Sequence, residues 1–260
     1  MRKNKVLTAF ACCVFVFLFL PLFIIAVTAF GGESTITFPV KSVSMKWFVN
    51  IFTSGSFFNS LKTSFQIALF ATVLALLVGV PAAYALARYT IKGKSMIQSF
   101  FLSPTIVPGI VLGFALYRFI VLVLRMPVFS ALLLGHFLAV LPYIIRVVGS
   151  SLSQFDFSIE EVAWSLGCGK VSAFFKVVLP NITSGVMAAF MLAFINSFNN
   201  IPVSMFLTGP GVSTFPTNLM NYIEYNYDPT VSAVSVLLML GTILIMFIVE
   251  KTLGIASLAK

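Results

Sequence analysis

Charged residues are scarce in this chain. Asp, Glu, Lys and Arg together make up 9% of its 260 residues, whereas 60% are hydrophobic. A water-soluble domain of this length could not cover its surface with so few charges. The composition therefore excludes a soluble globular protein and indicates one that lies in a membrane.

Residues that bind metals or form disulfides are also few. The chain has three cysteines, Cys12, Cys13 and Cys168, and one histidine, His136. They form no C-x-x-C pair and no His/Cys ligand spacing, so the sequence supports neither a zinc site nor a disulfide framework.

A complete phosphate-binding loop is missing as well. The pattern G-x-x-x-x-G-K-[ST] is matched at its end by Gly93-Lys94-Ser95, but Arg88 stands where the first glycine is needed. We therefore expect no nucleotide hydrolysis by this chain, no catalytic residues, no metal site and no bound cofactor.

Acidic groups inside the apolar runs are lacking too, because the seven Asp and Glu residues all lie outside their central parts. A carrier driven by an ion gradient usually needs ionisable residues within the membrane. His136 is the one candidate for such a relay. The alternative is a histidine that hydrogen-bonds a neighbouring helix.

Long apolar runs are abundant, and they predict an all-α membrane protein with six transmembrane helices. We expect a single transmembrane domain over 1–260. The predicted spans are roughly 6–30, 60–87, 97–123, 128–150, 182–207 and 231–253. The first run follows a basic start, but it is longer than the apolar part of a signal peptide and lacks a good cleavage site, so we expect an uncleaved span.

Basic residues indicate the orientation of these spans. If the spans alternate, one face holds both termini, 88–96 and 151–181, and it carries most of the Lys and Arg that account for the net charge of +9. The positive-inside rule then predicts that both termini and 151–181 are cytoplasmic.

The segment 151–181 is more polar than its surroundings and predicts two short helices. Ser158 and Glu161 fit a capping box at the start of a helix over about 159–166. Gly167, with Gly169 close behind, can adopt the left-handed conformation that ends it. A second helix is expected over about 170–178, closed by Pro180. These helices could form a lid on the chain's own inner end or a docking element for a soluble partner.

A spaced motif in this segment resembles the cytoplasmic "EAA" motif of ABC importer permeases. Glu161-x-Ala163-x-x-x-Gly167 is followed after nine residues by Val177-x-Leu179-Pro180. The family pattern has Ala where this chain has Val162, and Ile where it has Val177. Further stretches around 79–88, 103–110, 193–198 and 206–210 are similar to the spermidine/putrescine subgroup, in particular to the second permease of the pair.

The resemblance implies a type I ABC importer permease in the bacterial inner membrane, with 151–181 as the coupling segment. It implies two ATP-binding subunits that bind ATP and Mg²⁺, a second permease forming a heterodimer, and an extracytoplasmic solute-binding protein. The residues implied for coupling are Glu161, Ala163, Trp164, Leu166, Gly167, Phe174, Leu179 and Pro180. Among them Trp164, Leu166 and Phe174 are the expected contacts.

The fifth predicted span carries a dense set of polar residues. Asn196, Asn200 and Ser204 recur every four residues, and Asn199 lies beside them. In a continuous helix this spacing places the three on one face, and Pro202 permits a kink. The set could be hydrogen-bonding glue between helices. We favour the wall of a translocation path.

The cargo stays open at this point. Relatives of the polyamine subgroup often carry acidic residues where this chain has Asn199 and Asn200, and amides do not select for charge. A polyamine-like solute and an amino-acid, opine or phosphonate-like solute are both compatible. The alternatives to an importer are a secondary carrier driven through His136 and a membrane scaffold that transports nothing.

Overall fold

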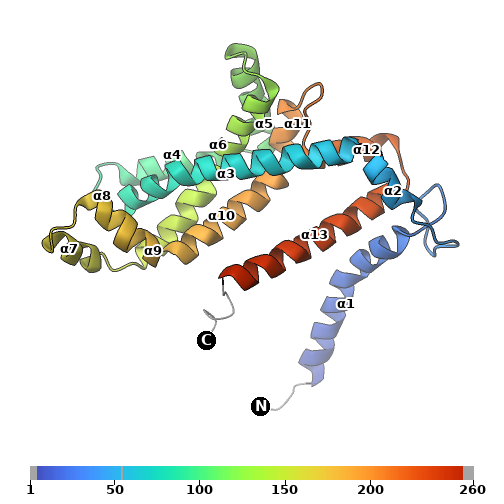
Figure 1. The fold of residues 1–260 in the computed structure, drawn as a ribbon, viewed down its shortest axis with the longest axis horizontal. Coiled ribbons are helices and arrows are strands. Elements are labelled where there is room, and N and C mark those ends of the chain that lie inside the picture. The colour runs from blue at the N-terminus through green and yellow to red at the C-terminus, as the bar shows by residue number, and fades with distance from the viewer. Residues whose placement is uncertain (1–4, 54, 254–260) are drawn as a thin grey trace. The chain divides into compact units, whose positions relative to one another are not determined.

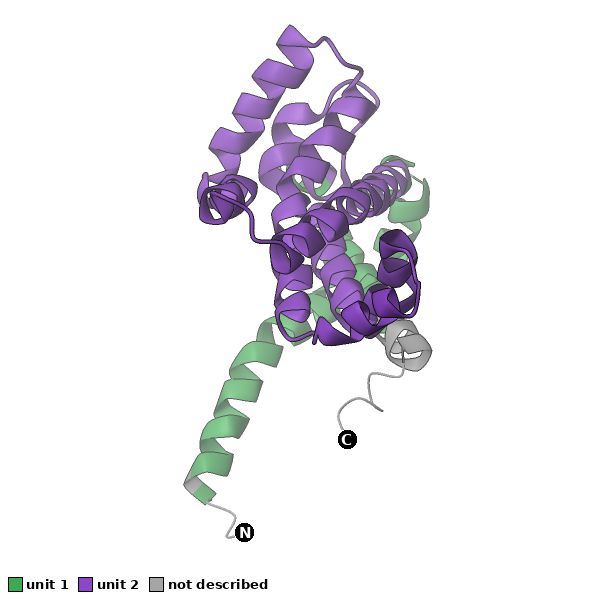
Figure 2. Ribbon diagram, turned by 90° about the vertical axis from the view of Figure 1, so that its left-hand side faces the viewer, with its two compact units in different colours: residues 1–58, 219–260 green, residues 59–218 purple. Residues whose placement is uncertain are grey.

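The structure is a computed structural model that describes residues 5–53 and 55–253. Within these residues the chain forms helices and no strand beyond two isolated bridges, which confirms the predicted all-α class. The helices form two compact units, residues 1–58 with 219–260 and residues 59–218 (Figure 2).

The larger unit, 59–218, contains most of the helices (Figure 1). In chain order these are α3 (Ser56–Arg88), α4 (Lys94–Ile106), α5 (Gly109–Leu116), η1 (Tyr117–Val123), α6 (Val128–Ser153), α7 (Ser158–Ser165), α8 (Lys170–Ala173), η2 (Phe174–Val178), α9 (Leu179–Asn181), α10 (Thr183–Phe198), α11 (Ile201–Leu207) and the start of α12 (Phe215–Tyr225). The two η segments are π-helical.

The smaller unit joins the two ends of the chain. Its helices are α1 (Lys5–Thr28), α2 (Lys46–Thr53) and α13 (Thr230–Leu253). The Thr28 hydroxyl donates to Ser232 Oγ over 3.0 Å, and the Asn50 amide donates to Thr230 Oγ1 over 3.1 Å, so both α1 and α2 are tied to the start of α13. The apolar side chains of α1 are otherwise largely exposed, as expected for a helix that faces lipid or a partner.

Three predicted spans are continuous helices in the described residues. Leu7–Thr28, Ser56–Arg88 and Val128–Ser153 are each long and apolar enough to cross a membrane. The sixth predicted span corresponds to α13, which is apolar over Thr230–Ile243.

The third predicted span, 97–123, is not one straight helix. Lys94–Ile106 and Gly109–Val123 meet at an angle of 99°. Val107 and Pro108 are extended at the break (ψ of 132° and 131°), because a proline disfavours the helical conformation in the residue before it. The motif around Pro108 is therefore a corner within the span.

The fifth predicted span, 182–207, is also divided. α10 ends at Phe198, and α11 begins at Ile201. The Asn200 side chain accepts a 3.0 Å hydrogen bond from the Val203 backbone N–H and caps the new helix, with Pro202 in its first turn. Asn200 therefore starts a helix, whereas the four-residue spacing assumed a continuous one.

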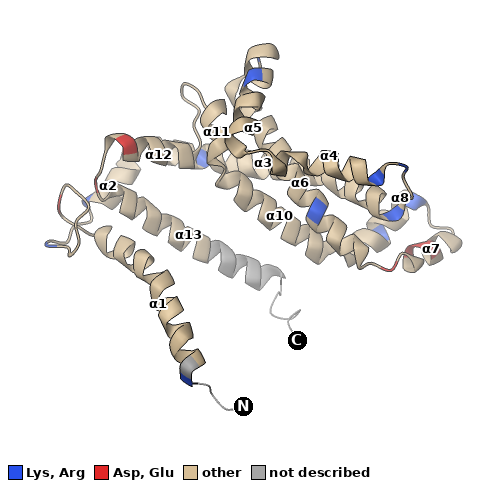
Figure 3. Ribbon diagram, turned by 180° about the vertical axis from the view of Figure 1, so that it is seen from behind, with Lys and Arg blue, Asp and Glu red and all other residues tan. Residues whose placement is uncertain are grey.

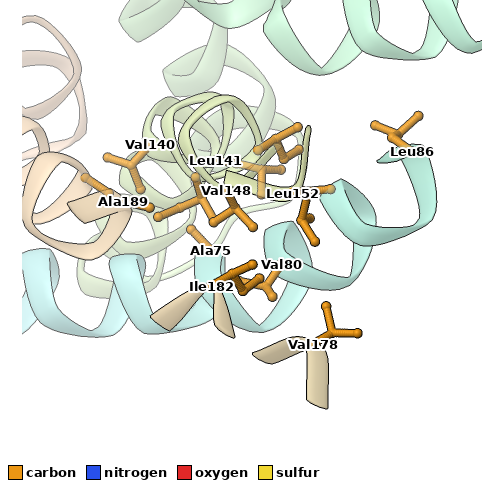
Figure 4. Close-up of a cluster of buried hydrophobic side chains, with 14 residues drawn as sticks. Ala75, Val80, Leu86, Val140, Leu141, Val148, Leu152, Val178, Ile182 and Ala189 are labelled. Carbon is orange, nitrogen blue, oxygen red and sulfur yellow. The ribbon is translucent and has the colours of Figure 1, made fainter. Parts of the chain in front are cut away.

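The core of the larger unit lies around α6, whose side chains are buried between α3 and α10. Figure 4 shows Val148 and Leu152 of α6 among Ala75 and Val80 of α3 and Ile182, which precedes α10. A second cluster joins α6 to α3, α5, η1 and α11. Close helix approach in a membrane requires small residues; at Gly185 of α10 any side chain would collide with Ser151 of α6.

Candidate functional site

The segment α7–α9 lies at the end of α3 in the larger unit (Figure 1). As predicted, it consists of two short helices joined at a glycine. The second helix was predicted to stop at Pro180, but helical structure continues through α8, η2 and α9 to Asn181. The wider π-helical turn of η2 precedes Pro180, and it accommodates a residue without a backbone N–H. The helix Lys170–Asn181 then meets α10 at 75°.

The start of α7 differs from the predicted capping box. Ser158 is the first helical residue, and no side chain caps the helix through Phe157. Instead the Ser158 backbone N–H donates to Asp156 Oδ1 over 3.0 Å. This hydrogen bond lowers the pKa of the Asp156 carboxyl. Glu161 therefore does not take part in a capping box, and its carboxylate interacts with another residue.

Glu160 is the buried anchor of α7. Its side chain has no exposed surface, and Oε1 accepts a 2.5 Å hydrogen bond from the Tyr84 hydroxyl of α3. Glu160 Oε2 lies 3.2 Å from Arg88 Nε, and the Arg88 guanidinium also donates to Glu161 Oε1 over 2.8 Å. The last turn of α3 thus holds both carboxylates of α7. We name Tyr84, Arg88, Glu160 and Glu161 the clasp.

Aromatic rings surround the clasp. The Arg88 guanidinium lies 4.9 Å from the Trp164 ring centroid and 5.3 Å from that of Phe157, distances typical of cation–π contacts. The Tyr84 and Phe174 ring centroids are 4.9 Å apart, and the ring planes meet at 64° in an edge-on contact. Because Trp164 and Phe174 pack on α3, these two expected contacts face inward and are half-buried.

Gly167 ends α7 with the backbone that only glycine adopts readily. Its φ is +86°, as predicted, while Gly169 has φ −67° and is ordinary extended backbone. The Gly167 N–H donates to the Trp164 carbonyl and the Cys168 N–H to that of Ala163. This pair of bonds is a Schellman motif, which turns the chain from α7 into α8.

The outer surface of this segment carries exposed apolar side chains among polar and charged ones. Leu166 is 84% exposed, Val171 73%, Phe175 59% and Val162 58%. Of the expected contacts only Leu166 belongs to this set; Ala163 and Leu179 are half-buried and Pro180 is exposed. Val162 is one of the two positions, with Val177, where the motif departs from the family pattern. We name Val162, Leu166, Val171 and Phe175 the outer face.

Sequence reasoning missed Glu160, Tyr84 and Arg88 as site residues. A signal was present: Tyr84 and Arg88 are four residues apart at the end of a predicted span, so they share one helix face. Two adjacent carboxylates in the next predicted cytoplasmic segment are natural partners for such an arginine. What the sequence does not give is which carboxylate becomes buried.

A second polar region lies where the two divided spans meet. A pocket of about 430 Å³ is lined by both helix breaks, by Tyr143 of α6 and by Asn196, Asn199 and Asn200. The lining from the first break includes Pro104, Thr105, Val107 and Gly109. None of its described lining residues is charged. Three of the four predicted path residues therefore share one pocket.

Ser204, the fourth, lies elsewhere. It is fully buried, and its hydroxyl lies 2.9 Å from His136 Nε2; Ser197 Oγ lies 2.8 Å from His136 Nδ1. His136 of α6 thus joins α10 to α11 across their break. We name these three residues the bridge. Both ring nitrogens lie within hydrogen-bond distance of neutral hydroxyls. This arrangement agrees with the interpretation of His136 as a histidine that hydrogen-bonds neighbouring helices.

Comparisons with known proteins agree with this architecture. The profile of the family described as "Binding-protein-dependent transport system inner membrane component" matches residues 75–253. The chain belongs to this family. It is therefore a permease subunit of an ATP-driven importer and a multi-pass membrane protein, as the motif implied, and a secondary carrier is not favoured.

Two relatives illustrate the range of the family. The chain is 27% identical to the spermidine/putrescine transport system permease protein PotC of Escherichia coli (strain K12), over 88% of this chain and 87% of PotC. It is 31% identical to the sulfoquinovosyl glycerol transport system permease protein SmoH of Agrobacterium fabrum, over 62% of this chain and 57% of SmoH.

A solved structure shows the same fold. The chain superposes on a bacterial ABC transporter involved in the import of the acidic polysaccharide alginate with a TM-score of 0.74. The match covers 96% of this chain and 98% of that chain at 18% identity. The fold is thus that of type I importer permeases.

Proposed function

We propose that α7–α9 couples this permease to an ATP-hydrolysing subunit. Closure of a pair of such subunits, which bind ATP and Mg²⁺, would move α7–α9 and the helices attached to it as a rigid body. The proposed assembly also contains a second permease and a solute-binding protein outside the cell. In this arrangement both termini of the chain are cytoplasmic. The family membership and the resemblance of 151–181 to the EAA motif support this arrangement.

The outer face is the observation that carries the coupling proposal. Exposed apolar side chains on a segment that also carries charged residues are a typical docking surface. The segment beneath them is fixed to α3 by the clasp, so force applied to the outer face reaches the membrane helices. An unattached loop would move without moving the helices.

The first test replaces Leu166, the most exposed residue of the outer face. Leu166→Arg places a charge in the proposed interface, and we expect at least about a tenfold loss of ATPase association and of uptake, the effect of losing one central contact. Co-purification with the ATPase subunit and cargo uptake in vesicles measure both.

Val43→Arg is the matched control, because Val43 is 80% exposed in the smaller unit. It should change neither measurement. ATPase association that survives Leu166→Arg at the wild-type level would refute the coupling proposal.

We further propose that the pocket between the helix breaks lies on the translocation path. Interrupted helices expose backbone and amide groups within a membrane only where they line a cavity. Asn196 Nδ2 and Asn200 Oδ1 bond their own backbone neighbours, which leaves Asn196 Oδ1 and Asn200 Nδ2 for a ligand. The pocket can therefore both accept and donate hydrogen bonds to a small polar solute.

A polyamine-like solute is the first cargo to test, because PotC is named for spermidine and putrescine. Without a carboxylate among the described lining residues, ammonium groups would be held by amide oxygens and by the Tyr143 ring. An amino-acid, opine or phosphonate-like solute is the alternative cargo. Uptake of labelled spermidine, with unlabelled solutes of each class as competitors, distinguishes them.

Asn199→Ala tests the path. Loss of one hydrogen bond to the cargo should lower uptake by about threefold to tenfold, while ATPase association stays unchanged. Asn226→Ala, an amide outside the pocket, is the control. Unchanged uptake in Asn199→Ala together with Asn196→Ala would show that the cargo does not use this pocket.

A further inference from the structure

A second pocket lies at the end of the larger unit that carries α7 and α8. It has a volume of about 560 Å³ and is formed by α3, α4, α6 and the segment leading into α7. It shares none of its described lining residues with the pocket at the helix breaks. Neither the coupling proposal nor the path proposal makes use of it.

The charge of this pocket is positive. Lys94 of α4 and Arg146 of α6 line it together with the polar Gln98 and Ser153, and no Asp or Glu is among the described lining residues. In the described part of the chain the ion pairs belong to Arg88, so neither Lys94 nor Arg146 has a carboxylate partner. Figure 3 shows how Lys and Arg gather at this end of the unit.

The position of Lys94 adds to this charge. It is the first residue of α4, so the positive end of that helix dipole lies at the pocket. Lys94 is half-buried and Arg146 is exposed, and a cavity lined by charges of one sign attracts counter-ions. The pocket is therefore suited to a negatively charged group.

The remaining walls are hydrocarbon. Leu102, Ile145 and Leu152 line the pocket, whose volume is in the range that holds a molecule much larger than a phosphate ion. The outer side of α4 presents Met96 and Phe100, 76% and 74% exposed, as a helix in contact with lipid does. A ligand with an anionic head and an apolar tail matches both parts of the surface.

We infer that this pocket binds an anionic phospholipid. The lipid phosphate lies between the Lys94 ammonium and the Arg146 guanidinium, and an acyl chain lies along the apolar wall. Basic pockets between transmembrane helices at the cytoplasmic side bind anionic head groups in this way. Because Phe157 lines the pocket and also contacts Arg88, a bound lipid stabilises the base of α7.

The test measures lipid retained by the full chain purified with its partner subunits. The complex is taken from vesicles of equal parts phosphatidylglycerol and phosphatidylcholine, and the lipid that stays bound is counted by native mass spectrometry. We expect selective retention of phosphatidylglycerol. Lys94→Gln combined with Arg146→Gln should reduce it by about thirtyfold, the effect of removing two charges near an anionic head group.

The matched control is Lys92→Gln combined with Lys176→Gln, which removes two exposed charges outside the pocket. Retention that falls equally in the control would assign the lipid to general surface charge and overturn the inference. Equal retention of phosphatidylcholine, or no retained lipid in the assembled complex, would also overturn it.

A soluble anion is distinguished in a second arm. Millimolar inorganic phosphate should leave the retained phosphatidylglycerol unchanged; full displacement by phosphate would overturn the lipid assignment. Size-exclusion profiles and thermal unfolding show that each variant is folded. Cargo uptake by Asn199→Ala is measured separately, so failure of the path proposal does not affect this result.

Discussion

The clasp and the bridge hold two interruptions of the apolar chain by different chemistry. At the end of α3 the clasp uses full charges, with one guanidinium shared by two carboxylates. Between α6, α10 and α11 the bridge uses one histidine and two hydroxyls. The clasp has its charges at the end of a span and the bridge has neutral groups along one, because an ion at membrane depth is far more expensive than a neutral hydrogen bond.

Removing Glu160 should have the largest effect on this comparison. Glu160→Ala leaves Arg88 and Tyr84 without their buried partner, and loss of one member of a buried ion pair costs about 3–5 kcal/mol. We expect a lower unfolding midpoint in detergent and loss of both ATPase association and uptake.

Glu161→Ala is the control within the same clasp. Its side chain is 58% exposed, so its pair with Arg88 should contribute less than about 1 kcal/mol. Equal destabilisation by the two variants would mean that burial does not separate the roles of the two carboxylates.

Removing the bridge should have a smaller effect. His136→Leu leaves the buried hydroxyls of Ser197 and Ser204 unpaired, which costs about 1–3 kcal/mol. Thermal unfolding should detect this loss, and uptake should fall because α10 and α11 also shape the pocket at their break.

The triple variant His136→Leu, Ser197→Ala, Ser204→Ala sharpens this test. Replacing all partners by apolar groups removes the unpaired atoms, so most of the lost stability should return. If stability returns while uptake stays low, the hydrogen bonds of the bridge are needed to keep the geometry of the break between α10 and α11. A triple variant less stable than His136→Leu contradicts the role assigned to the bridge.

Changing the turn after α7 should have the smallest effect on stability. Gly167→Val forces a β-branched residue into the left-handed conformation, at a cost of about 1–2 kcal/mol. Gly169→Ala is the control, because Gly169 has ordinary backbone and open space around it. Uptake should fall in the first variant and not in the second; equal uptake would show that the angle between α7 and α8 is not required.

The sequence predicted the spans better than their interruptions. Apolar runs are a sum over many residues, so single exceptions do not hide them. The corner at Val107-Pro108 and the new helix start at Asn200 depend on one or two residues each. Each break has a local sequence signal: Val107 precedes a proline, and Asn200 is a suitable N-cap two residues before Pro202. The continuous apolar runs across both positions outweighed these signals in the prediction.

The candidate site was predicted in part for a similar reason. Gly167 was identified because a left-handed turn is a local property of the backbone. The burial of Glu160 depends on Tyr84 and Arg88, which are distant in sequence, and the spacing of Asn196 and Ser204 misleads once the helix between them ends. Long-range partners of this kind require the packed structure.

The hydrogen bond between Tyr84 and Glu160 joins residues that are 76 positions apart. Everything between them, including the corner of α4 and α5 and the whole of α6, forms a loop that this contact closes. A displacement of α7 can therefore reach α3 directly through this contact and not only along the intervening chain. In the proposed coupling, α3 is therefore the helix that receives the motion of α7, and the clasp is the contact that transmits it.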